Sequence, residues 1–501
     1  MLQAIVDGRP EGMSDDGLRR RATRSIGWVV AERWGARFLS LGVLAILTRL
    51  LDPSQFGIVS LATSVLAISQ VFVDSGFGRT LIQRKELGEK DASTAFWTSL
   101  IFSLVLATAL VLTAPLIAGW FGEPALAPVL QVLSIALPLA ALSQIPAALL
   151  ERNLDFKPLS IRQLIGSLAG AIVSIPVALL GGGIWALVLQ TLVTSATAVV
   201  ALWASTSWRP KFEFSFAALR SMWSTGVAIL GIDLMDAVQA NIDKIVIGAF
   251  FSSTELGYYF LAQRVGTILI ELVTSVMARV SLATFSRVQD DKVRLDRIFR
   301  QMTFAAAAVS VFVFGLVAAL APQIITGIFG SQWTPSVPIV WILAGGWALG
   351  AIMYFDRNVL LATGNARAAL SLALVQNVVG TALVFAFVPW GVMGVAFSRL
   401  ARFIVWPLRL WVLRALTRVD VWKYLLQLIR CIAAMLPVLG GIIALQYTAW
   451  ASHGHLWLFA LPCALVATVA YGGLLWLLAG EENRSLLRRV TGDVLARLRR
   501  R

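Results

Sequence analysis

Long apolar runs dominate the chain, and short polar or charged segments separate them. A helix needs about 20 mostly apolar residues to cross the hydrocarbon core of a bilayer. Breaks at glycine, proline and charge clusters divide the sequence into runs of about this length. We therefore predict an all-α integral membrane protein with fourteen transmembrane helices, at residues 25–50, 55–83, 93–120, 125–150, 158–180, 184–205, 222–250, 255–284, 301–320, 336–363, 368–387, 391–413, 424–447 and 456–479.

Lysine and arginine gather in every second connection between these runs. The basic connections are 84–90, 152–162, 209–220, 287–300 and 414–423, and the connections without Lys or Arg include 52–55, 181–183, 252–255 and 388–390. Connections rich in Lys and Arg remain on the cytoplasmic side of a membrane. We therefore expect both termini to be cytoplasmic. A count that was wrong by one span would place basic and non-basic connections on the same side of the membrane.

The chain contains an internal repeat. The segment LLDPSQFGIVSLATSV at 50–65 matches FFSSTELGYYFLAQRV at 250–265, and the pairs Phe121-Gly122 and Phe329-Gly330 follow in the same order. Gly183 and Gly391 each begin a further matching segment. An even number of helices per copy gives two copies with the same orientation, and sites in such parallel repeats lie at the interface between copies.

This repeat sets the expected domain organisation. Helices 1–6 form an N-lobe and helices 7–12 a pseudo-symmetric C-lobe, and helices 13 and 14 lie outside the repeat. The expected parts are a cytoplasmic N-terminus at 1–24, the N-lobe at 25–205, a cytoplasmic linker at 206–221, the C-lobe at 222–413, helices 13–14 at 424–479 and a basic cytoplasmic tail at 480–501.

Composition agrees with a lipid environment. The 501 residues are 58% hydrophobic and 14% charged, whereas soluble domains carry about 25% charge. The net charge of +15 does not indicate nucleic acid, because the bases sit between membrane spans, where they orient the protein and contact anionic lipid headgroups. Cys431 and Cys463 lie in apolar runs, and His453 and His455 share one short loop. We therefore expect no disulfide framework, metal site or cofactor.

Ionisable residues inside the spans are costly, at about 2.5–3.5 kcal/mol for a charge at the bilayer centre. Arg79, Arg279, Arg357 and Arg409 lie close enough to a cytoplasmic end to reach the surface. Deeper cations are expected either to line a wet cavity between the lobes or to form buried structural pairs. Bases exceed acids within the spans, and arginine holds phosphate oxygens well. The candidate residues for binding an anionic cargo through its phosphate oxygens are Arg33, Arg37, Lys244, Arg264, Arg399 and Arg402.

Three acids in helices 7 and 8 are candidates for ion coupling. Asp236 and Asp243 lie seven residues apart on one face of helix 7, and Glu271 lies on helix 8. Burial favours the protonated form of a carboxyl group, so these residues are expected to bind H⁺ or Na⁺. A permanent salt bridge to Lys244 or Arg264 is an equally good interpretation of the same pattern.

Several segments together resemble a known family. They are RLLDPSQFG at 49–57, FVDSG at 72–76, RNLDFK at 152–157, NIDK at 241–244 and LGY at 256–258. The combination resembles the Wzx-type, colanic-acid-exporter-like polysaccharide flippases of the multidrug/oligosaccharidyl-lipid/polysaccharide (MOP) superfamily over about residues 20–415. The resemblance implies a MATE-like fold of two lobes around a central cavity, with alternating access.

The resemblance also implies a function. The expected protein is a flippase that moves undecaprenyl-diphosphate-linked oligosaccharides across the bacterial inner membrane for exopolysaccharide or O-antigen export. Its expected partners are the lipid-linked cargo, membrane lipids, and a polymerase and glycosyltransferases of the same pathway. A multidrug or cation antiporter of the same fold is the alternative, which the excess of arginine disfavours. A membrane enzyme is not expected, because the non-cytoplasmic connections are short and lack ionisable residues at 321–335.

Overall fold

The structure is a computed structural model of the 501-residue chain, and it describes residues 35, 38–74, 77–83, 89–153, 155–446, 456–481 and 483–484. Every regular element within these ranges is a helix. The chain divides into two compact units, residues 1–238 and 239–501, and the division falls inside one long helix. The expected lobe boundaries at the linker 206–221 remain a prediction.

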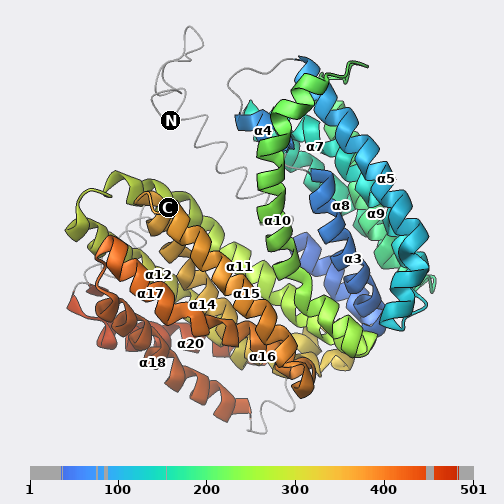
Figure 1. The fold of residues 1–501 in the computed structure, drawn as a ribbon. Helices are drawn as coiled ribbons and strands as arrows, with labels where there is room; N and C mark the ends of the chain where they lie inside the picture. Colours follow the sequence, from blue (N-terminus) through green and yellow to red (C-terminus); the bar gives the residue numbers. More distant parts are fainter. Residues whose placement is uncertain are drawn as a thin grey trace, which may run out of the picture. The chain divides into compact units, whose positions relative to one another are not determined.

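The N-terminal unit begins, in its described part, with a helical stretch at Phe38–Leu50. The helices that follow are α3 (Pro53–Asp74), α4 (Phe77–Gln83), α5 (Glu89–Phe121), α6 (Leu126–Leu133), α7 (Ala136–Arg152), α8 (Phe156–Leu179) and α9 (Ile184–Ser205). Helix α7 packs against α5 and α9, and α8 packs along α9, so these four helices run side by side (Figure 1).

Helix α10 (Phe216–Phe250) enters the C-terminal unit. The elements that follow are α11 (Ser253–Arg287), α12 (Lys292–Ala319), α13 (Ala321–Ile324), a π-helical turn η1 (Ile325–Phe329), the 3₁₀ turn η2 (Ser331–Trp333), α14 (Ser336–Ala362), α15 (Ala366–Ala386), the 3₁₀ turn η3 (Val388–Trp390), α16 (Gly391–Ala401), the 3₁₀ turn η4 (Arg402–Val405), α17 (Trp406–Thr417), α18 (Val421–Gln446) and α20 (Leu456–Leu478). Helix α14 packs against α11 and α12, and α12 packs against α18.

The predicted spans and the observed helices agree closely. Among the described residues, ten helices are long and apolar enough to cross a membrane, and shorter apolar helices lie at Phe38–Leu50 and Pro462–Leu478. Two further helices, α10 and α11, have 35 residues each. Each of the predicted apolar runs contains a helix, so the all-α membrane fold is confirmed. A count of fourteen spans is consistent with this arrangement and remains a prediction.

The internal repeat is visible in the backbone. Gly122 and Gly330, which match in the repeat, both have a positive φ, at 66° and 110°. Gly183 and Gly391 also match, and they have φ values of 54° and 72°. They stand at the start of the helices α9 and α16. Residues with a side chain rarely adopt such angles. Gly122 and Gly330 therefore mark matching helix ends, and Gly183 and Gly391 mark matching helix starts.

Small residues bring α8 and α9 close together in the N-terminal unit. A Cβ atom added at Gly170 would lie 2.1 Å from the Thr194 hydroxyl oxygen, and one at Gly166 would lie 2.7 Å from the Thr194 carbonyl oxygen. Small residues permit close helix approach where lipid, not water, is the solvent. The two glycines therefore let the backbones of α8 and α9 approach closely, and van der Waals packing stabilises the pair.

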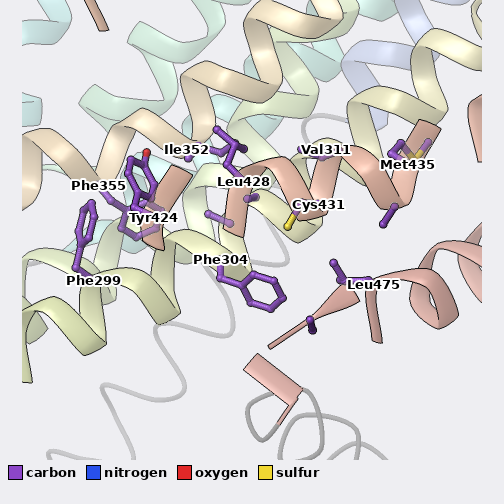
Figure 2. Packing of buried hydrophobic residues seen from close by; sticks show 14 of the residues in the cluster. Phe299, Phe304, Val311, Ile352, Phe355, Tyr424, Leu428, Cys431, Met435 and Leu475 are labelled. Atoms are coloured by element: carbon purple, nitrogen blue, oxygen red, sulfur yellow. The ribbon is translucent and has the colours of Figure 1, made fainter. Parts of the chain in front are cut away.

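Large apolar side chains form the core of the C-terminal unit. Figure 2 shows Phe299 and Phe304 of α12 and Phe355 of α14 near Tyr424 and Leu428 of α18. Phe299 and Tyr424 meet edge to face with 5.3 Å between ring centroids. Residues of α20 join the same cluster, so helices 13 and 14 of the sequence prediction, α18 and α20, belong to this core.

Candidate functional site

A tight turn between α10 and α11 creates the first polar site. Helix α10 ends at Phe250 and α11 begins at Ser253, so the chain reverses direction within two residues. Ser252 and Glu255 form a capping box, in which the Ser252 hydroxyl accepts from the Glu255 N–H and the Glu255 carboxylate accepts from the Ser252 N–H. Capping fixes the start of α11. Tyr259 and Gln263, one and two turns further along, thereby lie opposite Asp243 of α10.

Asp243 is fully buried, and the donors around it gather on one of its two carboxylate oxygens. Its Oδ2 atom accepts hydrogen bonds from the Tyr259 hydroxyl, from Gln263 Nε2 at 3.2 Å and from Arg399 Nε at 3.0 Å. The Arg399 Nη2 atom of α16 also lies 2.6 Å from Oδ1. We call Asp243, Tyr259, Gln263 and Arg399 the Asp243 cluster. Ionised groups form strong hydrogen bonds, and a buried ion pair needs such bonds to offset its lost hydration.

The helix that carries Arg399 is interrupted three residues later. Helix α16 ends at Ala401, a 3₁₀ turn covers Arg402–Val405, and α17 has Pro407 in its first turn. Proline lacks an N–H and fits the first turn of a helix, not its interior. The single span expected at 391–413 lies within one apolar helical segment, Val388–Thr417, which contains the 3₁₀ turn Arg402–Val405 between α16 and α17.

Arg402 differs from Arg399 because it has no ion-pair partner in the described part of the chain. Its Nε atom is buried without a hydrogen bond. The Arg402 Cβ lies beside Gly380 of α15, and Gly380 also faces the Gln239 amide of α10. Gln239 is held by the Thr381 hydroxyl at 3.2 Å. Among the described residues, Arg402 is therefore a cation that forms no ion pair with a carboxylate.

The other predicted site residues are not members of the Asp243 cluster. Lys244 donates to the Asn241 side chain at 3.2 Å, and Arg264 and Glu271 are half-buried on α11. Asp236 is exposed on the part of α10 that belongs to the N-terminal unit. Arg33 and Arg37 lie outside the described residues. The described ranges contain no group of three or more His, Cys, Asp or Glu residues arranged to hold a metal.

A second buried ion pair was not among the candidate site residues. Asp356 of α14 is fully buried, and its Oδ2 atom lies 3.5 Å from Arg409 Nε of α17. The Arg409 side chain is 13% exposed and donates to Gln376 and to the Met353 carbonyl oxygen. The expectation that Arg409 reaches the surface is therefore wrong, because inward acceptors hold its guanidinium group. Arg357, the next residue after Asp356, is exposed.

The N-terminal unit contains an acidic cavity of about 220 Å³. The carboxylates of Asp74, Glu151 and Asp233 line it together with Gln144 and small residues of α4 and α7. The Gln144 amide donates to the Asp74 carbonyl oxygen. Sequence spacing did not identify this cavity, because its three acids come from three different helices.

Comparison with known proteins gives the family. Residues 46–338 match the model of a family described as polysaccharide biosynthesis protein. Succinoglycan biosynthesis transport protein ExoT of Rhizobium meliloti is 26% identical over 65% of this chain and 66% of its own length. Teichuronic acid biosynthesis protein TuaB of Bacillus subtilis is 30% identical over 60% of this chain and 62% of its own length. The lipopolysaccharide biosynthesis protein WzxC of Escherichia coli is 23% identical over 61% and 62%, respectively.

Solved structures share the fold. Lipid II flippase MurJ in an inward closed conformation superposes with a TM-score of 0.73 at 15% identity, over 92% of this chain and 99% of that one. An inward-facing multidrug resistance MATE family transporter of the MOP superfamily superposes with a TM-score of 0.62 at 15% identity, over 77% and 96%. The matched segments span less than two thirds of the three curated relatives. The chain has the MOP fold and belongs to the family of polysaccharide biosynthesis proteins.

Proposed function

We propose that the protein is a flippase for lipid-linked oligosaccharides that serve polysaccharide export. Its cargo would be an undecaprenyl-diphosphate-linked repeat unit, moved across the bacterial inner membrane by alternating access. The family match and relatives named as biosynthesis transport proteins support this proposal. A MurJ-like fold of apolar helices supports a route through the membrane.

The observation that carries the proposal is the uncompensated charge of Arg402. Arg399 is neutralised by Asp243 at 2.6 Å, so its charge is not available to a cargo. Arg402 has no carboxylate partner among the described residues, and its Nε lacks a hydrogen bond. Arg402 is half-buried, with a buried Nε atom. A cation that has lost part of its hydration and has no anion is costly, and a diphosphate supplies both the charge and the acceptors. Arg402 is therefore our first choice for the cation that binds the diphosphate.

The remaining predicted residues complete the proposal. Arg33, Arg37, Lys244 and Arg264 would add positive charge along the route. Coupling to H⁺ or Na⁺ would use Asp236, Asp243 or Glu271, and the cytoplasmic location of both termini follows from the basic connections. A polymerase and glycosyltransferases would act before and after transport.

An export assay with Arg402→Ala tests this function. The host is a strain that lacks its own flippase gene, in which the wild-type chain is expected to restore surface polymer. Arg402→Ala should insert normally and lose export, because the diphosphate loses its charge partner. Arg414→Ala, on the exposed side of α17, is the matched control and should export normally. Full export by Arg402→Ala, and also by the double variant Arg33→Ala and Arg37→Ala, would contradict the basic-cavity mechanism.

The acidic cavity of the N-terminal unit favours a second candidate, a cation antiporter. Asp74, Glu151 and Asp233 line a space of about 220 Å³, which suits a small cation better than an oligosaccharide. Binding of a fluorescent lipophilic cation to the purified protein, lost in Asp233→Asn, would support this alternative. Export activity with no cation binding would reject it.

A further inference from the structure

The Asp356 ion pair is the second place where a carboxylate is buried in the C-terminal unit. Asp356 Oδ2 and Arg409 Nε face each other at 3.5 Å, and neither atom has a hydrogen bond. The Tyr424 hydroxyl lies 3.5 Å from Asp356 Oδ1, at the limit of a hydrogen bond. The carboxylate is thus fully buried with weak contacts only.

Arg409 does not depend on Asp356 for its position. Its Nη1 donates to Gln376 Oε1 of α15 at 3.2 Å, and its Nη2 donates to the Met353 carbonyl oxygen at 3.1 Å. These acceptors are neutral, so Asp356 supplies charge compensation and little geometry. If the carboxylate gained a proton, the pair would change from neutral to a net charge of +1. A buried guanidinium without a counter-charge is unfavourable, so α17 would be driven to move or to admit water.

The surroundings of Asp356 contain few other ionisable groups. Arg409 of α17 and Tyr424 of α18 face its carboxylate, together with the neutral Trp406 indole. On α14 itself Arg357 is exposed, and on α11 Ser281 accepts from Asn358 at 2.8 Å. From α15, Gln376 reaches the site only through Arg409. No second carboxylate near the pair is present in the described ranges to share an added proton.

Because the helix is interrupted, the Asp356–Arg409 pair can act on α17 separately from α16. The Arg399 ion pair connects α16 to α10. The Arg409 ion pair and its hydrogen bond to Gln376 connect α17 to α14 and α15. The 3₁₀ turn at Arg402–Val405 lies between these two arginines. A change in charge at Asp356 therefore weakens one of the contacts that hold α17, while the Asp243 cluster continues to hold α16.

We propose that Asp356 is a proton-binding site that controls α17. Water donates a proton to Oδ2, the Arg409 guanidinium loses its counter-charge and α17 loosens, and return of the proton to water restores the pair. Use of this site to couple transport to a proton gradient rests on the flippase function proposed above. Proton binding itself does not.

Infrared difference spectroscopy on the full chain in lipid vesicles tests proton binding without any cargo. Between mildly alkaline and mildly acidic buffer, the wild-type protein should gain the C=O stretching band of a protonated buried carboxyl group. Asp356→Asn should lose this band. Asp420→Asn, the surface control, should keep it. Because Asp356→Asn could fail to fold, Tyr424→Phe provides a second test and should keep the band but shift its frequency. An unchanged band in Asp356→Asn would overturn the proposal, as would a band that Tyr424→Phe leaves unmoved.

A transport assay tests coupling separately. Vesicles containing the protein and a fluorescent undecaprenyl-diphosphate oligosaccharide are given a pH gradient. Wild-type flipping should accelerate, whereas Asp356→Asn should flip at its gradient-free rate. Acceleration that survives in Asp356→Asn would refute coupling through this site. If the wild-type protein moves no cargo, the flippase proposal fails, while the infrared result still decides whether Asp356 binds a proton.

Discussion

Asp243 and Asp356 are both fully buried, and both pair with an arginine from the interrupted helix, yet their surroundings differ. Asp243 receives three hydrogen bonds on Oδ2, and Arg399 Nη2 lies 2.6 Å from Oδ1. Each carboxylate has one oxygen without a hydrogen bond, and Asp356 differs because its arginine lies at 3.5 Å and its other oxygen meets only the Tyr424 hydroxyl, also at 3.5 Å. Burial is therefore the same in the two cases, and the number of donors determines which carboxylate is held firmly as an anion.

The largest expected effect is on stability when either carboxylate is removed. Asp243→Ala leaves Arg399, Tyr259 and Gln263 without their common acceptor, and should cost about 3–5 kcal/mol, the range for breaking a buried pair. Asp356→Ala should cost clearly less, because Arg409 keeps its bonds to Gln376 and Met353. Thermal unfolding of the purified variants in detergent measures both. Equal losses of Tm in the two variants would contradict the claim that Asp243 is held more firmly than Asp356.

A smaller loss of stability is expected from a substitution at the contact between α11, which contributes Tyr259 and Gln263, and α14, which carries Asp356. Gly266 of α11 lies against the Trp347 indole of α14, and an added Cβ would lie 2.0 Å from its ring. Gly266→Ala should therefore separate α11 from α14 at a cost of about 1–3 kcal/mol, as for other overpacked cores. Gly345→Ala, whose Cβ would meet the Leu400 side chain at an ordinary 3.5 Å, is the control. Thermal unfolding with little loss in Gly266→Ala, or an equal loss in both, would contradict this packing.

The smallest effect concerns Asp420, a carboxylate outside the membrane spans. Partial burial acts to raise the pKa of Asp420, and hydrogen bonds from Lys423 with the charges of Lys423 and Arg300 outweigh it and hold that pKa below its ordinary value. A depressed pKa contributes stability that is present above the unfolded value, about 3.9, and is lost as pH falls through the folded value. Asp420→Ala should cost about 0.5–1 kcal/mol near neutral pH, because it removes the N-cap bond to Lys423. This difference in Tm from the wild type should shrink in strong acid, and a difference that grows there would contradict the assignment.

Sequence patterns were sufficient for the helices and the repeat. Apolar runs located the spans, and the matched glycines at 183 and 391 proved to share a positive φ. Partners of the buried charges were harder to find, because the pattern offered Lys244 or Arg264 for Asp243 and the structure pairs it with Arg399. Arg399 is 156 residues away, and only the packing of α16 against α11 and α14 brings it near.

The orientation of Arg409 could not be predicted for a related reason. A continuous helix turns 100° per residue and a 3₁₀ turn 120°, so the four residues of η4 rotate α17 by about 80° relative to a straight continuation of α16. A helical projection drawn through residues 391–413 therefore assigns Arg409 to the wrong face. The bases at 33 and 37 remain predictions, because they lie outside the described residues.

The packing of α18 and α20 limits how this chain can be shortened. Although the repeat ends before them, their side chains cover Phe299, Phe304 and Phe355 in one continuous apolar core (Figure 2). A version reduced to the duplicated helices alone would open that surface to lipid and leave the Tyr424 side of Asp356 unsupported. The last two helices are therefore best treated as an integral part of the second unit.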